Sequence, residues 1–279
     1  MRAHPIRGTI RRASAALAAA AIAAATLAGC AATESTPDAN APALPPAGGA
    51  LDYQLGGAYD PPAGVQIVAR DRAASPADGL YNICYVNAFQ TQPGELDRWP
   101  DALLLHEDKD TLVHDPDWPD EVILDTRQSA SIADVVVPWI RGCADDGFDA
   151  VEFDNLDTYT RTGGALTRDD NLALATLLVT AAHDAGLAAG QKNAAEDAPL
   201  LHSRAGFDFA VTEECVAYDE CDAYTSVYGE HVLAIEYPDT LTVPFAQACA
   251  APGRPASLVL RDRDLVTPGE AGYAYERCG

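Results

Sequence analysis

Short apolar segments recur along the chain from residue 65 onward, and longer segments with helical periodicity separate them. The short segments are four to six residues long, which is typical of buried strands rather than of helices. Two separating segments predict helices: "ASIADVVVPWIRGCADDG" ends at a glycine, and "TRDDNLALATLLVTAAHDAG" begins with Thr167 as N-cap and ends at Gly186. The eight predicted strands are residues 65–69, 81–86, 121–125, 149–153, 187–191, 207–211, 232–236 and 257–260.

This alternation of strands and helices predicts an α/β fold with a parallel sheet and crossover helices. Eight strand–helix units in residues 51–279 fit a small (β/α)8 barrel, the TIM barrel, and a doubly wound open sheet is the alternative. The sequence has no GxGxxG motif after the first strand and no Walker loop. Nucleotide binding is therefore not supported, and no cofactor is expected.

The first 50 residues have a different pattern. A basic start, "MRAHPIRGTIRR", precedes a small-residue apolar stretch, which predicts a signal peptide over residues 1–29. The stretch ends in "LAGC", which resembles a bacterial lipobox, in which the cysteine, here Cys30, is acylated and becomes the mature N-terminus. Residues 30–50 then form an Ala/Pro-rich flexible linker, and residues 51–279 form the folded domain. We expect an exported, monomeric protein that is lipid-anchored to the extracytoplasmic face of the cell envelope; an ordinary cleaved signal is the alternative.

The composition adds a strong negative charge. Removal of residues 1–29, which hold four arginines and no acids, lowers the formal net charge from −24 to −28. Binding to nucleic acid requires a basic surface, so this class of partner is excluded. The negative field suits a cationic ligand, although solubility explains it equally well.

The cysteines fit an exported protein. Six remain after Cys30, and an even number in an exported domain predicts disulfides. None of their spacings resembles a zinc site, so no metal is expected. Of the 15 possible pairings, local spacing favours Cys215–Cys221, with Cys249–Cys278 and Cys84–Cys143 as the remaining pairs.

Polar residues gather where the predicted strands end, and in a barrel this is the face that carries the active site. Glycoside hydrolysis uses two carboxyl groups that flank the scissile bond. Asp154 and Glu213 follow alternate strands, which contribute to one interior layer, so we expect them to face each other. Lys192 lies on the strand between them and can keep one carboxylate ionised.

Four segments in sequence order, "GFDAVEFDNLDTY", "LTRDDNLALATLLVTAAHDAGLAAGQKNAAE", "FDFAVTEECVAYDECDAY" and "VLAIEY", resemble glycoside hydrolase family 114 from about residue 80 to 240. Its members are endo-α-1,4-polygalactosaminidases and related proteins with a TIM-barrel fold. The resemblance implies an endo-acting hydrolase of partly deacetylated, cationic α-1,4-linked galactosamine polymers. The alternative is a non-catalytic surface lipoprotein that binds such a polysaccharide.

The resemblance also implies roles for individual residues. It places the catalytic carboxylates at Asp154 and Glu213, and we favour Asp154 as nucleophile and Glu213 as acid/base. Glu152 departs from the family pattern and has no assigned role. The expected substrate-binding residues are Asp125, Asn155, Asp157, Lys192, Asn193, Glu236 and Tyr237.

Overall fold

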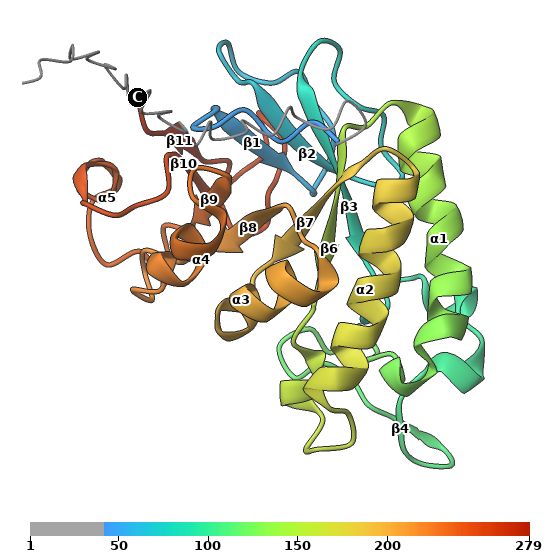
Figure 1. Cartoon of the computed structure of the whole chain (residues 1–279). Helices are drawn as coiled ribbons and strands as arrows, with labels where there is room; N and C mark the ends of the chain where they lie inside the picture. Colours follow the sequence, from blue (N-terminus) through green and yellow to red (C-terminus); the bar gives the residue numbers. More distant parts are fainter. Residues whose placement is uncertain (1–41) are drawn as a thin grey trace, which may run out of the picture. The chain divides into compact units, whose positions relative to one another are not determined.

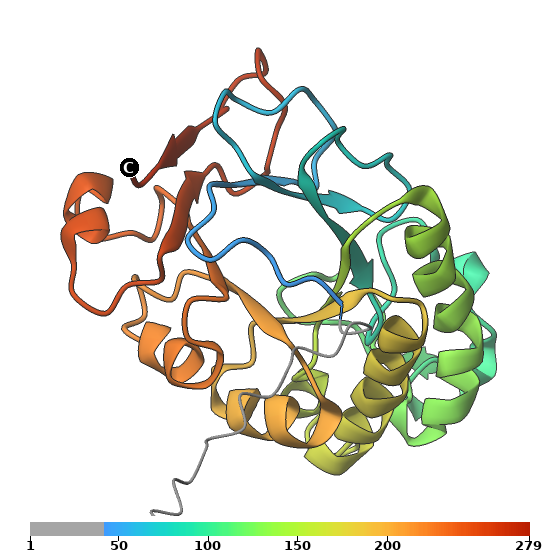
Figure 2. The same cartoon turned by 45° about the horizontal axis from the view of Figure 1, so that its top comes forward.

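The structure, a computed structural model, describes residues 42–279. The predicted signal peptide, Cys30 and the first part of the predicted linker lie outside these residues. The described chain forms a barrel of eight parallel strands with helices on its outside (Figures 1 and 2). The parallel strands are β1 (Leu51–Gln54), β2 (Ile67–Asp71), β3 (Tyr81–Asn87), β6 (Ala150–Asp154), β7 (Ala188–Lys192), β8 (Phe209–Glu213), β9 (Val232–Glu236) and β10 (Ser257–Arg261). The other elements are the hairpin β4 (His106–Asp108) and β5 (Thr111–Leu112), the strand β11 (Tyr275–Arg277), and helices α1 (Ser129–Asp146), α2 (Arg168–Asp184), α3 (Ala198–Leu200), α4 (Cys221–Tyr228) and α5 (Phe245–Ala250).

The predicted TIM barrel is confirmed, but one predicted strand is wrong and one was missed. Residues 121–125 make only isolated antiparallel bridges to the long connection between β3 and α1, so they lie outside the barrel ladder. The first barrel strand is instead β1, whose buried Asp52 and Gln54 broke the apolar pattern. Because the two errors cancel, the strand that ends at Asp154 is the fourth strand, as predicted.

Strand alternation divides the buried side chains into two groups. In β6, Ala150 faces the barrel interior together with Glu152 and Asp154, whereas Val151 and Phe153 pack outward in the helix-covered core. In β7 the interior position of Gly190 has no side chain, and a Cβ there would lie 2.5 Å from the ring of Phe209. This glycine therefore lets an aromatic ring fill the barrel below the polar end.

Both predicted long helices are present on the outside of the barrel (Figure 2). Helix α2 begins with a capping box in which the Thr167 hydroxyl and the Asp170 carboxylate each accept from the other residue's backbone N–H. Helix α1 ends at Gly147, whose φ of 95° is the left-handed conformation that favours glycine. Among the described helices, none combines the length and apolar character needed to cross a membrane.

The barrel closes between β10 and β1 through side chains. The backbone ladder runs from β1 to β10 and ends with β11, which is antiparallel to β10. Arg261 on β10 is fully buried and donates to Asp52 Oδ1 at 3.1 Å and to the Tyr53 carbonyl, both on β1. This buried arginine therefore takes the place of the missing ladder bonds at the seam.

Residues 43–49, predicted as flexible linker, are instead bonded to the N-terminal end of the barrel. The Ala43 carbonyl accepts from Tyr81 at the start of β3, and the Gly49 carbonyl accepts from Ser257 at the start of β10. The Pro45 carbonyl lies 3.1 Å from the ring of His231, just before β9. Figure 2 shows this segment crossing the barrel opening.

Three disulfides join the six cysteines of the described chain, and the predicted pairing is confirmed. Cys84–Cys143 ties β3 to α1, and Cys249–Cys278 ties α5 to the C-terminus. Cys215–Cys221 closes a short loop after β8. This last loop borders the site described next.

Candidate active site

Three carboxylates surround one buried ammonium group inside the C-terminal end of the barrel. Lys192 Nζ lies 3.1 Å from Glu213 Oε2, 3.4 Å from Asp154 Oδ2 and 3.6 Å from Glu152 Oε1. It also donates to the hydroxyl of Tyr53 at 3.1 Å. Lys192 is only 2% exposed, and one of its three carboxylates, Glu152, is fully buried. Burial alone would lower the pKa of Lys192, but Asp154, Glu213 and Glu152 outweigh it and hold that pKa well above its usual value.

The two outer carboxylates each have further hydrogen-bond donors. Glu213 accepts from the Tyr237 hydroxyl and from Asn193 Nδ2 at 3.1 Å. Asp154 accepts from the Tyr85 hydroxyl at 2.8 Å and from the backbone N–H of the next residue at 2.8 Å. Burial raises the pKa of Glu213, but Lys192 and the donors Tyr237 and Asn193 favour the ionised form more strongly and lower the pKa overall.

Glu152 lies below this pair and has a different environment. Its Oε1 accepts from the Tyr53 hydroxyl at 2.7 Å, whereas its Oε2 is buried without a partner among the described residues. Burial is the main cause that raises the pKa of Glu152 to about 7, against the opposing charge of Lys192. The acid without an assigned role is therefore a buried partner of Tyr53 and Lys192, and it does not line the cleft.

At three strand ends the backbone turns so that two consecutive side chains reach the cleft. In a continuing strand they would point to opposite faces. Asn155, Asn193 and Glu214 follow Asp154, Lys192 and Glu213, and their φ angles are 64°, 49° and 62°. This left-handed conformation is easiest for asparagine among residues other than glycine, and it ends the alternation at each position.

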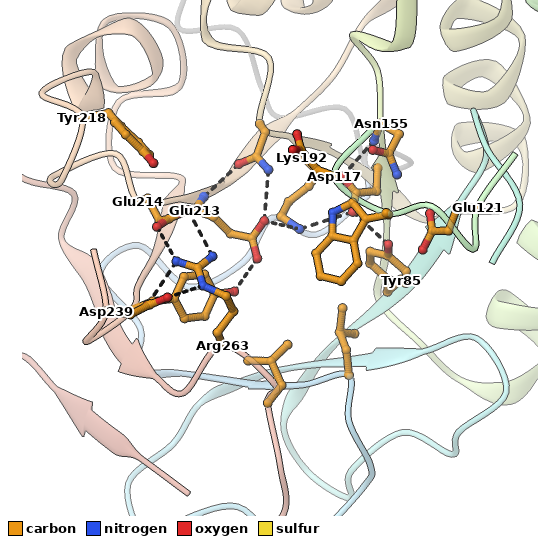
Figure 3. Close-up of a pocket in the computed structure, with 16 residues that line it drawn as sticks. Tyr85, Asp117, Glu121, Asn155, Lys192, Glu213, Glu214, Tyr218, Asp239 and Arg263 are labelled. Atoms are coloured by element: carbon orange, nitrogen blue, oxygen red, sulfur yellow. Dashed lines mark hydrogen bonds and ion pairs between the residues drawn. The ribbon is translucent and has the colours of Figure 1, made fainter. Parts of the chain in front are cut away.

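The carboxylates open into a cleft of about 700 Å³ (Figure 3). Figure 3 shows Lys192 and Glu213 near its middle, Tyr218 and Asp239 towards one end, and Glu121 towards the other. At the Tyr218 end, Arg263 pairs with Asp239 at 2.6 Å and with Glu214 at 2.7 Å.

Two aromatic side chains on the cleft wall are unusually exposed. Trp118 is 59% exposed and Tyr218 is 64% exposed, the latter within the loop closed by Cys215–Cys221. Beyond Trp118 the cleft residues also border a smaller hollow of about 160 Å³, which is lined by Asp157 and Arg161. Asp154 therefore lines both the cleft and this hollow.

Most predicted site residues meet in this cleft, but Asp125 and Glu236 do not. Asn155, Lys192, Asn193 and Tyr237 line the cleft together with Asp154 and Glu213, and Asp157 lines the adjoining hollow, where it pairs with Arg161 at 2.9 Å.

Asp125 lies away from the cleft because residues 121–125 are not a barrel strand. Its carboxylate pairs with Arg127 at 2.6 Å and borders a separate hollow. Glu236 lies away from the cleft for another reason, because it points outward from β9, away from the side of Tyr237. There it is fully buried and accepts the backbone N–H groups of Val216 and Ala217 at 2.8 and 3.2 Å. Burial is the main cause that raises its pKa to about 7.

Several site residues were missed from the sequence. Tyr53 belongs to the missed strand β1, Trp118 lies on a connection without a regular pattern, and Glu121 begins the segment 121–125 that was predicted as a strand. Arg263 comes two residues after the end of β10, and the rule that barrel sites lie beyond strand ends could have found it.

The spacing of the two outer carboxylates defines what the site can do. Asp154 Oδ2 and Glu213 Oε2 lie within 3.4 Å and 3.1 Å of the same nitrogen, so they are at most about 6.5 Å apart. Paired carboxyl groups in retaining glycosidases are about 5–5.5 Å apart, and those in inverting enzymes about 6.5–9.5 Å. A TIM barrel with such a pair at the C-terminal end of its strands is the construction of a glycoside hydrolase.

The chain belongs to glycoside-hydrolase family GH114, whose family model matches residues 31–279. Among solved structures, Ega3 from Aspergillus fumigatus, determined in complex with galactosamine, is similar with a TM-score of 0.69 and 26% identity, over 85% of this chain and 98% of that chain. The glycoside hydrolase domain of PelA from Pseudomonas aeruginosa has a TM-score of 0.57 and 14% identity, over 80% of this chain and 98% of that chain, and shows the shared fold. No curated protein matches the chain.

Proposed function

We propose that this protein is an endo-acting glycoside hydrolase that cleaves α-1,4-linked galactosamine-containing polysaccharide with Asp154 and Glu213. The observation that carries the proposal is the pair of carboxylates held together by Lys192 in an open cleft. The substrate class is supported by family membership and by the galactosamine bound to Ega3. Asp154 lines both the cleft and the adjoining hollow, and this extended open space supports cleavage within a chain.

The carboxylate separation favours a retaining mechanism in two steps. Asp154 attacks the anomeric carbon while Glu213 gives a proton to the departing glycosidic oxygen. A water molecule then attacks the covalent glycosyl-enzyme, Glu213 takes its proton, and Asp154 leaves. Lys192 and Tyr85 both contact Asp154 Oδ2 and orient this carboxylate for attack.

The lowered pKa of Glu213 means that this acid must gain its proton as the substrate binds. Substrate covering the cleft removes water from Glu213, and burial favours the neutral carboxyl group. Contact between Lys192 and three carboxyl groups allows this change, because the ammonium still contacts Asp154 and Glu152 when Glu213 becomes neutral.

The negative charge of the chain supports a cationic substrate. Deacetylated galactosamine is protonated below the pKa of its amine, and carboxylates bind an ammonium group by charge-assisted hydrogen bonds. We also propose that the protein is monomeric, exported and lipid-anchored at Cys30, on the basis of the "LAGC" motif and the preceding signal pattern. Mass spectrometry of the mature N-terminus tests the anchor.

The experiment that tests the function measures new reducing ends released from an α-1,4-galactosamine polymer. We expect wild-type protein to shorten the chain, and Asp154→Asn and Glu213→Gln each to lower kcat by about a thousandfold or more. The exposed Glu107→Gln is the matched control and retains activity. Wild-type protein that binds the polymer without shortening it would identify a non-catalytic lipoprotein instead. A first-formed product with an inverted anomeric centre would contradict the retaining mechanism.

A further inference from the structure

Glu121 is a cleft carboxylate that the proposed mechanism does not use. It lines the same cleft as Asp154 and Trp118, and the residue is only 9% exposed. Figure 3 shows it at the opposite end from Arg263 and Asp239. The acids at that other end already have a cationic partner, since Arg263 pairs with both Asp239 and Glu214.

The hydrogen bonds of Glu121 leave one oxygen uncommitted. Asn87 Nδ2 and Gln90 Nε2 both donate to Oε2, at 3.0 and 2.6 Å. Oε1 accepts no hydrogen bond from the described residues, and it is not sealed from solvent. Two amides thus fix the orientation of the carboxylate, and its free oxygen is left for a ligand in the cleft.

A chain of hydrogen bonds connects Glu121 to the proposed nucleophile. Asn87 donates to Glu121, Asn155 Nδ2 donates to Asn87 Oδ1 at 3.1 Å, and the Asn155 N–H donates to Asp154 at 2.8 Å. The two carboxylates therefore belong to one wall of the cleft. Burial and the nearby charge of Asp154 raise the pKa of Glu121, so an added cation would be favourable there.

We propose that Glu121 Oε1 binds the 2-ammonium group of the galactosamine residue whose anomeric carbon Asp154 attacks. This inference rests on the proposed function. The amino group stands on the carbon next to the anomeric carbon, so a carboxylate beside the nucleophile is suitably placed for it. An N-acetyl group at this position is neutral and bulkier, and it cannot form the charge-assisted bond. Glu121 then sets the preference for deacetylated over N-acetylated residues.

The test compares wild-type protein, Glu121→Gln and Glu107→Gln on one galactosamine oligomer, used deacetylated and after full chemical N-acetylation. The glutamine is isosteric and its carbonyl can still accept from Asn87 and Gln90, so the wall should keep its structure. Reducing-end release gives kcat/KM, and calorimetry gives Kd for both oligomers. On the deacetylated oligomer we expect Glu121→Gln to lower kcat/KM and to raise Kd, each by about tenfold to a hundredfold. On the acetylated oligomer both changes should be less than about twofold. Glu107→Gln should match wild type on both oligomers.

Two outcomes would overturn the inference: equal losses on both oligomers, which indicate a structural or catalytic role, or no loss on either. If wild-type protein cleaves neither oligomer, the proposed function fails. The Kd values of wild type and Glu121→Gln for the two oligomers then decide the inference by themselves, because binding of the ammonium group does not require turnover.

Discussion

Replacement of Lys192 by methionine should destabilise the protein strongly at neutral pH. At separations of 3.1 to 3.6 Å, each ion pair is worth about 5 kcal/mol at an effective dielectric constant of about 20, before the cost of burying the charges. Removal of one partner of a buried ion pair costs about 3–5 kcal/mol net, because it leaves charge uncompensated. We expect the free energy of unfolding to fall by that amount, and the Tm to fall by roughly 6–20 °C.

The sign of the pH dependence follows from the carboxylates. Lys192 lowers the pKa of Glu213 in the folded state, so its loss raises that pKa above the value in the unfolded chain. The resulting destabilisation is fully present above the pKa that Glu213 has in the folded variant. It shrinks as the pH falls to about 4, where the carboxyl groups become protonated in both the folded and the unfolded state.

Urea denaturation at pH 7, 5.5 and 4 measures this difference. The control is Lys109→Met, since Lys109 is exposed and is the only other lysine in the chain. A loss below about 1 kcal/mol at pH 7, or a loss that stays constant down to pH 4, would refute the reasoning.

Three further predictions concern the buried acid, the cleft loop and the charge of the substrate. Burial raises the pKa of Glu152 to about 7, so Glu152→Gln should become more stable relative to wild type as the pH rises from about 4.5 to 7, and should gain no stability below that range. Denaturation at pH 4 and 8 measures this difference, and a variant that is less stable relative to wild type at pH 8 than at pH 4 contradicts the prediction. Replacement of Cys215 and Cys221 by serine removes a disulfide that spans a sequence separation of 6 and should cost about 2 kcal/mol of stability, against about 4 kcal/mol for the same replacement of Cys84 and Cys143, by chain entropy. Denaturation measures both losses, and only the first replacement should raise KM, because its loop carries Tyr218. An increase of salt from about 0.05 to 0.5 M should raise KM for deacetylated polymer severalfold and leave KM for N-acetylated polymer unchanged, whereas Trp118→Ala should raise both at every salt concentration.

The barrel and the convergence of its polar strand ends could be predicted from the sequence, because strand parity and chain order decide them. Asp154 and Glu213 are the last residues of strands with clear apolar patterns, so the sequence was sufficient to predict that they meet in one cleft. Glu236 shows a limit of that reasoning. It is adjacent to Tyr237, and two consecutive residues of a continuing strand cannot both enter the barrel. The sequence does not show which strand ends turn into the left-handed conformation, as they do at Asn155, Asn193 and Glu214.

The contribution of residues 115–120 could not be predicted from the sequence, for a different reason. This segment has no regular periodicity, and single bridges such as His114 to Val122 position it over the cleft. Long-range contacts therefore decide where Trp118 and Glu121 lie. The first strand was missed because its polar residues are stabilised by groups distant in sequence, as Asp52 is by Arg261.

If Cys30 is lipid-anchored as proposed, the attachment of residues 43–49 to the N-terminal end of the barrel bears on which way the cleft faces. The described chain begins beneath the barrel, beside the starts of β3, β9 and β10, whereas the cleft opens at the opposite ends of the strands. With Cys30 acylated as proposed, the chain from there to Pro42 can span at most about 40 Å. The cleft would then face away from the membrane and stay close to the membrane surface. In that position the cleft would meet polymer that arrives from outside the cell rather than polymer that lies against the lipid.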